Sequence, residues 1–131
     1  MAFLDSVGMI FIGDAMHFYR PNDVYAFQII GSTSKQPICR KIPILSWSGN
    51  VSYKKIIDRA WLEQHPLPEH PLKKSTEEAK SYKIRRDGRD GKVFLVVPHS
   101  RNDYAGGNVT IPLHTPEEAC SMEFSGLYCG Y

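Results

Sequence analysis

Proline and glycine recur along the whole chain, and they limit the length of every regular element. The 131 residues include nine prolines and ten glycines. Proline ends helices and interrupts strands, while glycine supplies turn conformations that other residues avoid. A bundle of long helices is therefore excluded, and we expect many short elements joined by turns.

Short apolar or alternating runs between these residues predict the strands. The predicted strands cover residues 7–12, 15–19, 24–30, 38–47, 81–86, 92–97 and 109–113. The segment 20–23, Arg-Pro-Asn-Asp, has the composition of a turn between two of them. Pro43 cannot donate a ladder hydrogen bond, so the strand at 38–47 is expected at an edge or a bulge.

Two helices are predicted, at about 52–64 and 116–123. In the first, apolar residues recur at helical spacing: Tyr53, Ile56, Ile57, Ala60 and Trp61. The second has strong start signals, with Thr115 as N-cap, Pro116 in the first turn and Glu118 completing a capping box.

These elements predict one α+β domain over residues 1–131. Its main feature is an antiparallel sheet of about six or seven short strands, accompanied by the two helices. Residues 65–76 hold several prolines and are expected to form an extended connector, and residues 125–131 are expected to be a C-terminal tail.

Neither a metal nor a disulfide is needed to stabilise a chain of this length, which buries roughly two thirds of its unfolded surface. The three cysteines, Cys39, Cys120 and Cys129, match no disulfide framework and no zinc-ligand spacing. A Cys120–Cys129 bridge would require an oxidising compartment. We expect no cofactor and no metal site.

The first residues lack the pattern of a secretory signal. They contain no basic segment, and Asp14 and His17 interrupt their apolar run. No stretch approaches the roughly 20 apolar residues of a membrane-spanning helix. We expect a soluble, intracellular protein.

Charge is distributed unevenly along the chain, although the net charge is only +2. Residues 1–50 carry four basic and three acidic groups (+1), residues 51–102 twelve and seven (+5), and residues 103–131 none and four (−4). Such asymmetry is typical of a surface for a charged partner. It is also compatible with an acidic C-terminal segment that folds back onto the basic middle of the same chain.

The basic hairpin, residues 80–104, is the leading candidate surface. Its strand at 81–86 alternates apolar and basic residues, which predicts a half-exposed strand near the sheet edge, and the apolar strand at 92–97 is expected inside the sheet. The candidate binding residues are Lys83, Arg85, Arg86, Arg89, Lys92, Arg101 and Tyr104. Basic residues on an edge strand also prevent unwanted strand pairing, which would explain them without a ligand.

The favoured function is that of a non-enzymatic interaction protein with an anionic partner. RNA or single-stranded nucleic acid is the first choice, because cations bind phosphates and Tyr104 offers a stacking ring. An acidic protein or a membrane surface is the second.

Two alternatives remain open. A metal-independent ribonuclease could use His99 and His114 as acid and base, with Arg85 or Arg101 beside them. A self-assembling, matrix- or coat-like structural protein is suggested by the aromatic-rich residues 9–27, which a small domain has difficulty covering alone. A homo-oligomer would follow from the second alternative.

Overall fold

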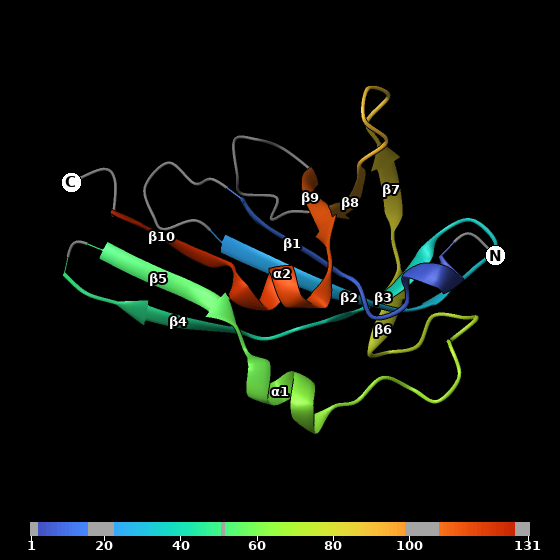
Figure 1. Ribbon diagram of the computed structural model, residues 1–131, viewed down its shortest axis with the longest axis horizontal. Coiled ribbons are helices and arrows are strands. Elements are labelled where there is room, and N and C mark those ends of the chain that lie inside the picture. Colours follow the sequence, from blue (N-terminus) through green and yellow to red (C-terminus); the bar gives the residue numbers. More distant parts are fainter. Residues whose placement is uncertain (1–2, 16–22, 51, 99–107, 128–131) are drawn as a thin grey trace.

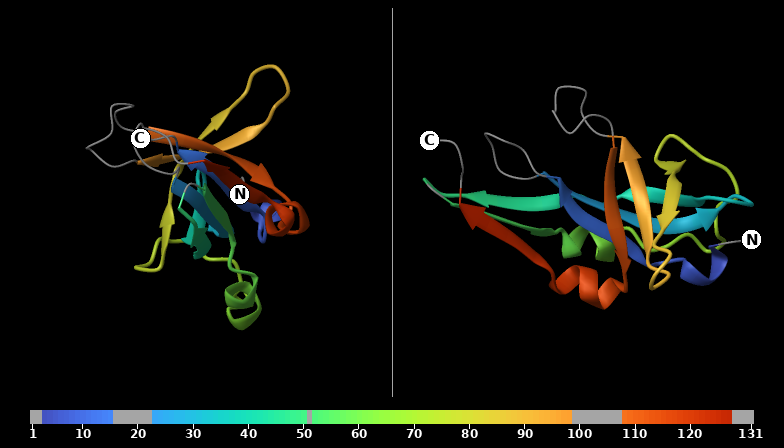
Figure 2. Two further views of the ribbon diagram at one scale, coloured as in Figure 1. Left: turned by 90° about the vertical axis from the view of Figure 1, so that its left-hand side faces the viewer. Right: turned by 90° about the horizontal axis from the view of Figure 1, so that it is seen from above.

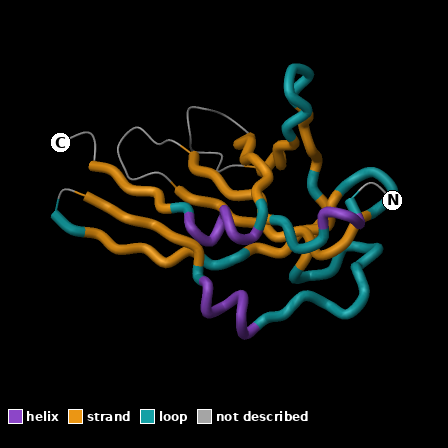
Figure 3. Tube along the Cα trace, viewed as in Figure 1, coloured by secondary structure: helices purple, strands orange, loops and turns teal. Residues whose placement is uncertain are grey.

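The computed structural model describes residues 3–15, 23–50, 52–98 and 108–127 (Figure 1). In these ranges the chain forms a seven-stranded sheet and a three-stranded sheet, with two short α-helices. Neighbouring strands pair antiparallel throughout both sheets. The predicted single α+β domain, built mainly from antiparallel sheet, is confirmed (Figure 3).

The elements follow one another closely, apart from the long segment between α1 and β6. In order they are a 3₁₀-helix Leu4–Ser6, β1 Ile10–Ala15, β2 Asp23–Ser32, β3 Pro37–Lys41, β4 Ile44–Ser48, β5 Ser52–Ile57, α1 Arg59–Gln64, β6 Ala79–Ser81, β7 Lys83–Arg86, β8 Val93–Pro98, β9 Asn108–His114, α2 Pro116–Ser121 and β10 Glu123–Leu127. The large sheet has the order β6-β3-β2-β1-β9-β8-β7, and the small sheet has the order β10-β5-β4.

The large sheet curls until its two ends approach each other (Figure 2). Strands β6 and β7 stand at opposite ends of the strand order, yet Tyr82 alone separates them in the chain. The Tyr82 N–H donates to the Pro37 carbonyl oxygen at 3.2 Å, and its ring lies 5.1 Å from the ring of Phe27. Tyr82 therefore joins the sheet ends and covers one side of the interior.

Two hydrophobic cores lie on opposite faces of β1 and β2, because side chains alternate between the faces of a strand. The curled sheet encloses the first core, which includes Phe11, Phe27, Ile29, Leu95 and Ile111. The second core joins the large sheet to the small sheet and α2, and it includes Ile10, Ile12, Val24, Ile57 and Ala119.

The helix predicted at about 52–64 is wrong in its first half. Ser52–Ile57 is β5, the central strand of the small sheet, paired with β4 on one side and β10 on the other. Pairing on both sides, with residues that favour strands, outweighs the helical spacing of the same apolar residues. Only Arg59–Gln64 is helical, and its N-cap is Asp58, whose carboxylate accepts a hydrogen bond from the Trp61 N–H at 3.1 Å.

The strand predicted at 38–47 is two strands in different sheets. It breaks at Ile42 and Pro43, where the chain leaves β3 in the large sheet and enters β4 in the small one. The expected irregularity at Pro43 is thus a change of sheet. The predicted strands at 7–12 and 15–19 also differ from the structure: β1 runs continuously over Ile10–Ala15, while residues 16–22 lie outside the described ranges.

The helix predicted at 116–123 is confirmed over Pro116–Ser121, with both hydrogen bonds of the Thr115–Glu118 capping box. The tail predicted at 125–131 is wrong in its first three residues, because β10 extends to Leu127 and pairs with β5. Residues 128–131 lie outside the described ranges.

The connector at 65–76 contains no helix and no strand of its own, and it is anchored to the large sheet through Leu72. The Ser32 N–H donates to the Leu72 carbonyl oxygen at 2.9 Å, and the Leu72 N–H donates to the Ile30 carbonyl oxygen at 3.1 Å. Gly31 lies against this backbone, and a Cβ atom at this position would overlap Leu72. The approach therefore requires glycine.

The helices of the described ranges are short: α1 and α2 have six residues each, and a membrane-spanning helix is not found there.

Candidate nucleic-acid interface

In the described ranges, the basic hairpin consists mainly of β7, β8 and the turn between them. Strand β7 ends the large sheet, and β8 lies between β7 and β9, as the charge pattern indicates. The Asp87 N–H donates to the Lys92 carbonyl oxygen at 2.9 Å and closes the turn. The Asp87 and Asp90 carboxylates accept from the backbone N–H groups of Arg89 and Lys92. Both aspartates therefore act as turn residues.

The strand register assigns each hairpin residue to one face of the sheet, because directly paired residues share a face. Ile84 pairs with Leu95, which pairs with Ile111, and this row faces the enclosed core. The two adjacent rows face outward. We call their six residues the basic face: Lys83, Val96 and Thr110 in one row, and Arg85, Phe94 and Pro112 in the other.

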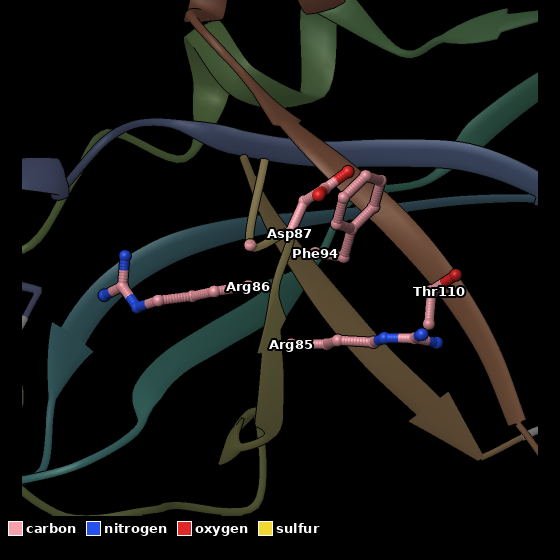
Figure 4. A pocket seen from close by; sticks show the side chains of 6 residues that line it. Arg85, Arg86, Asp87, Phe94 and Thr110 are labelled. Carbon is pink, nitrogen blue, oxygen red and sulfur yellow. The ribbon is translucent and has the colours of Figure 1, made fainter. Parts of the chain in front are cut away.

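The basic face is open to solvent. Lys83, Arg85 and Thr110 are exposed, whereas Phe94 is half-buried. An open pocket of about 340 Å³ lies here, lined by Arg85, Arg86, Asp87, Gly88, Phe94 and Thr110. Figure 4 shows the Arg85 side chain extending toward Thr110 on β9, while Arg86 points the other way. The face therefore combines cations, a hydroxyl group and an aromatic ring.

In the described part of the hairpin, most cations are available to a ligand. Lys92 lies 3.9 Å from the Asp90 carboxylate, with both side chains well exposed. Within the described ranges, Lys83, Arg85, Arg86 and Arg89 form no ion pair. Exposed cations without a partner bind phosphates without first breaking an internal pair.

The acidic C-terminal segment does not neutralise these cations in the part of the chain that the structure describes. In this part of the chain, Glu123 forms an ion pair with Lys54 on the small sheet, at 3.6 Å. Glu118 is held locally: hydrogen bonds from the backbone and hydroxyl of Thr115 lower the pKa of its carboxyl group. Within the described ranges, Glu118 and Glu123 therefore have partners outside the basic hairpin.

Three predicted site residues, His99, Arg101 and Tyr104, lie outside the described ranges. His114 ends β9, where it pairs with Ile10, and its Nε2 atom is buried. Pro98, which precedes His99, pairs with Asn108 at the other end of β9. Six residues of strand span about 20 Å, so Pro98 and His114 lie at opposite ends of β9.

The sequence did not point to Phe94 and Thr110, which the structure places on the basic face. An apolar run such as residues 93–97 indicates burial on both faces, whereas the structure leaves the Phe94 face partly open. Phe94 belongs to none of the hydrophobic clusters found among the described residues. The sequence contains one signal for the exposure of Phe94. Once the turn is placed at residues 87–92, Phe94 pairs with Arg85 and therefore shares its face of the sheet.

The remaining reactive groups do not form a second centre in the described residues. Burial raises the pKa of the Cys39 thiol, so this cysteine stays protonated and behaves as a small core residue. No group of three His, Cys, Asp or Glu residues in these ranges is arranged to hold a metal ion.

The fold and the site together define a small α+β protein with a basic, partly aromatic face on a curled antiparallel sheet. Comparison of the chain with protein-family models, curated proteins and solved structures finds no match.

Proposed function

We propose that this protein binds single-stranded nucleic acid, with RNA as the first choice, through the basic face, and that it acts as an interaction protein rather than an enzyme. The observation that carries the proposal is the position of Phe94 between the strands that present Arg85 and Thr110, with no described carboxylate paired to Arg85 or Lys83.

Each component has a defined role in such binding. Lys83 and Arg85 would contact successive phosphates, and the released counter-ions would favour association. The Phe94 ring would stack on an unpaired base, an interaction that tolerates any sequence. Thr110 would donate a hydrogen bond to a phosphate or sugar oxygen. Val96, which lies between Lys83 and Thr110, would contact the nucleic-acid backbone between these residues.

The test is a titration of labelled single-stranded RNA with the full chain, followed by fluorescence anisotropy. Lys83→Glu with Arg85→Glu is expected to weaken binding by roughly 10-fold or more, because each reversal replaces an attraction with a repulsion. The matched control is Lys73→Glu with Lys74→Glu, which makes the same charge change on the connector and is expected to lose far less affinity.

Parallel titrations identify the partner. Single-stranded RNA is expected to bind more tightly than duplex RNA, vesicles with acidic phospholipids or polyglutamate. Tighter binding to vesicles or to polyglutamate would assign the face to a membrane or an acidic protein and overturn the RNA proposal. Equal losses in the hairpin variant and the connector variant would show that the basic face is not the site.

A further inference from the structure

One outer strand of the small sheet, β4, exposes two large apolar side chains. Its residues include two of the four large hydrophobic side chains that are exposed among the described residues: Leu45 is 40% exposed and Trp47 is 51% exposed. Both lie on the face of the small sheet that points away from the second core, opposite Ile56 and Lys54 on β5. Strand β4 is also the last strand in its sheet (Figure 1).

The backbone of β4 pairs with β5 on one side and can pair with a further strand on the other. Hydrogen bonds at 3.0 Å from the Asp58 N–H to Pro43 and at 2.9 Å from the Gly49 N–H to Ser52 lie at the two ends of the β4–β5 pairing. Hydrogen-bonded pairs alternate along an antiparallel ladder, so Leu45 and Trp47 direct their backbone groups toward β5. Ile44, Ser46 and Ser48 therefore direct theirs to the open edge.

One outer strand of the large sheet, β7, is protected in the usual way. Strand β7 carries Lys83, Arg85 and Arg86, and charges on an edge strand discourage pairing with another chain. The sequence of β4, Ile-Leu-Ser-Trp-Ser, contains no charge and no proline. Lys54, on the neighbouring strand β5, already has interaction partners. Its amino group lies 3.6 Å from the Glu123 carboxylate and 5.7 Å from the centroid of the Trp47 ring. The edge is thus neutral as well as apolar.

We propose that β4 pairs with β4 of a second copy of this chain around a two-fold axis at Ser46. In this register Ser46 forms a hydrogen-bonded pair with its symmetry mate, and Ile44 pairs with Ser48 of the second copy, which gives up to about six backbone hydrogen bonds. Leu45 then lies opposite Trp47 of the second copy in the closely spaced type of pair. The two small sheets become one continuous sheet.

A second copy fits this edge better than a charged peptide does. The edge offers no free charge to select an acidic or a basic segment, and its own two exposed side chains complement each other across the axis. Lys54 stands one strand behind β4, so the two copies of this cation are separated by the paired β4 strands and do not repel each other at contact distance.

The proposal is tested with the full chain by light scattering after size-exclusion chromatography, over a range of concentrations. The wild-type protein is expected to show the mass of a dimer. Leu45→Lys is expected to raise the dimer dissociation constant by roughly 100-fold, because the symmetric interface receives the charge twice. Leu67→Lys, at a position that is 41% exposed on the connector, makes the same change elsewhere and is expected to leave the dimer intact.

A second variant keeps the test valid if Leu45→Lys unfolds. Ser46→Cys places two thiols across the axis, at a backbone separation that a disulfide can bridge, and oxidation is expected to yield a covalent dimer. Lys83→Cys, on the outer strand β7 of the large sheet, is expected to give no such product. A monomeric wild-type protein at its highest soluble concentration would overturn the proposal, and so would a dimer that Ser46→Cys fails to cross-link.

Discussion

The ring of Phe94 is the feature by which the proposed nucleic-acid binding differs from a simple attraction between opposite charges. A lipid headgroup or a carboxylate needs the cations of the basic face, but neither needs an aromatic surface. Phe94 is partly exposed and lies directly opposite Arg85, so a base that stacks on the ring brings its phosphate close to the guanidinium.

Phe94→Leu is therefore expected to weaken the binding of single-stranded RNA by roughly 5-fold or more, since stacking contributes about 1–3 kcal/mol per base. Phe94→Tyr retains the ring and is expected to bind nearly as well as the wild type. Anisotropy titrations of the two variants provide the comparison. If leucine and tyrosine behave alike, the ring does not stack on a base.

Because Cys39 is buried, we expect the folded state to lose stability at high pH. Burial raises the pKa of its thiol above the ordinary value of 9.0, and burial likewise raises the pKa of the Tyr82 phenol. Because the folded state keeps these protons while the unfolded state releases them, their contribution is complete below the unfolded pKa and declines as the pH rises.

Above about pH 9, Cys39 alone is expected to lower the free energy of unfolding by about 1.4 kcal/mol per pH unit. Urea denaturation at several pH values measures this slope, and Cys39→Ala is expected to reduce it. An identical slope in the alanine variant would mean that Cys39 is not the group responsible.

At the scale of elements, α2 connects local sequence to the second core. It begins at a complete capping box and places Ala119 in the second core, next to β1 and β5. Thr115→Ala removes the hydroxyl that accepts the Glu118 N–H and is expected to destabilise the protein by about 1 kcal/mol.

Thr115→Ser keeps the hydroxyl and is expected to retain most of that stability. Chemical denaturation measures both variants. Equal destabilisation by serine and alanine would show that the Thr115 methyl group, rather than the cap, stabilises α2.

Elements with a distinctive local pattern were predictable from the sequence. The capping box specified the start of α2, and the contrast between basic and apolar runs specified β7 as the outer and β8 as the inner strand. Strand β5 was not predictable, because Tyr53, Ile56 and Ile57 fit a helical spacing and only the pairing with β4 and β10 selects the strand. The exposure of Phe94 likewise depends on register and on what covers each sheet face.

At the scale of the whole molecule, the two proposed surfaces lie on different sheets. The basic face belongs to β7, β8 and β9, and the open apolar edge belongs to β4. Phe11 and Phe27, two aromatic residues of the segment 9–27 that suggested self-assembly, are buried within the curled sheet. Assembly through β4 would leave the basic face free and would give each pair of molecules two such faces, so that long RNA binds more tightly than short RNA.

The salt dependence of RNA binding tests the central claim most directly. The logarithm of the dissociation constant for a short single-stranded RNA is measured against the logarithm of salt concentration, for the wild type and for Lys83→Gln with Arg85→Gln. Two lost phosphate contacts are expected to reduce the slope by about 1.4, at about 0.7 for each contact. The control, Lys73→Gln with Lys74→Gln, is expected to keep the wild-type slope. A slope unchanged in the hairpin variant would contradict binding through the basic face.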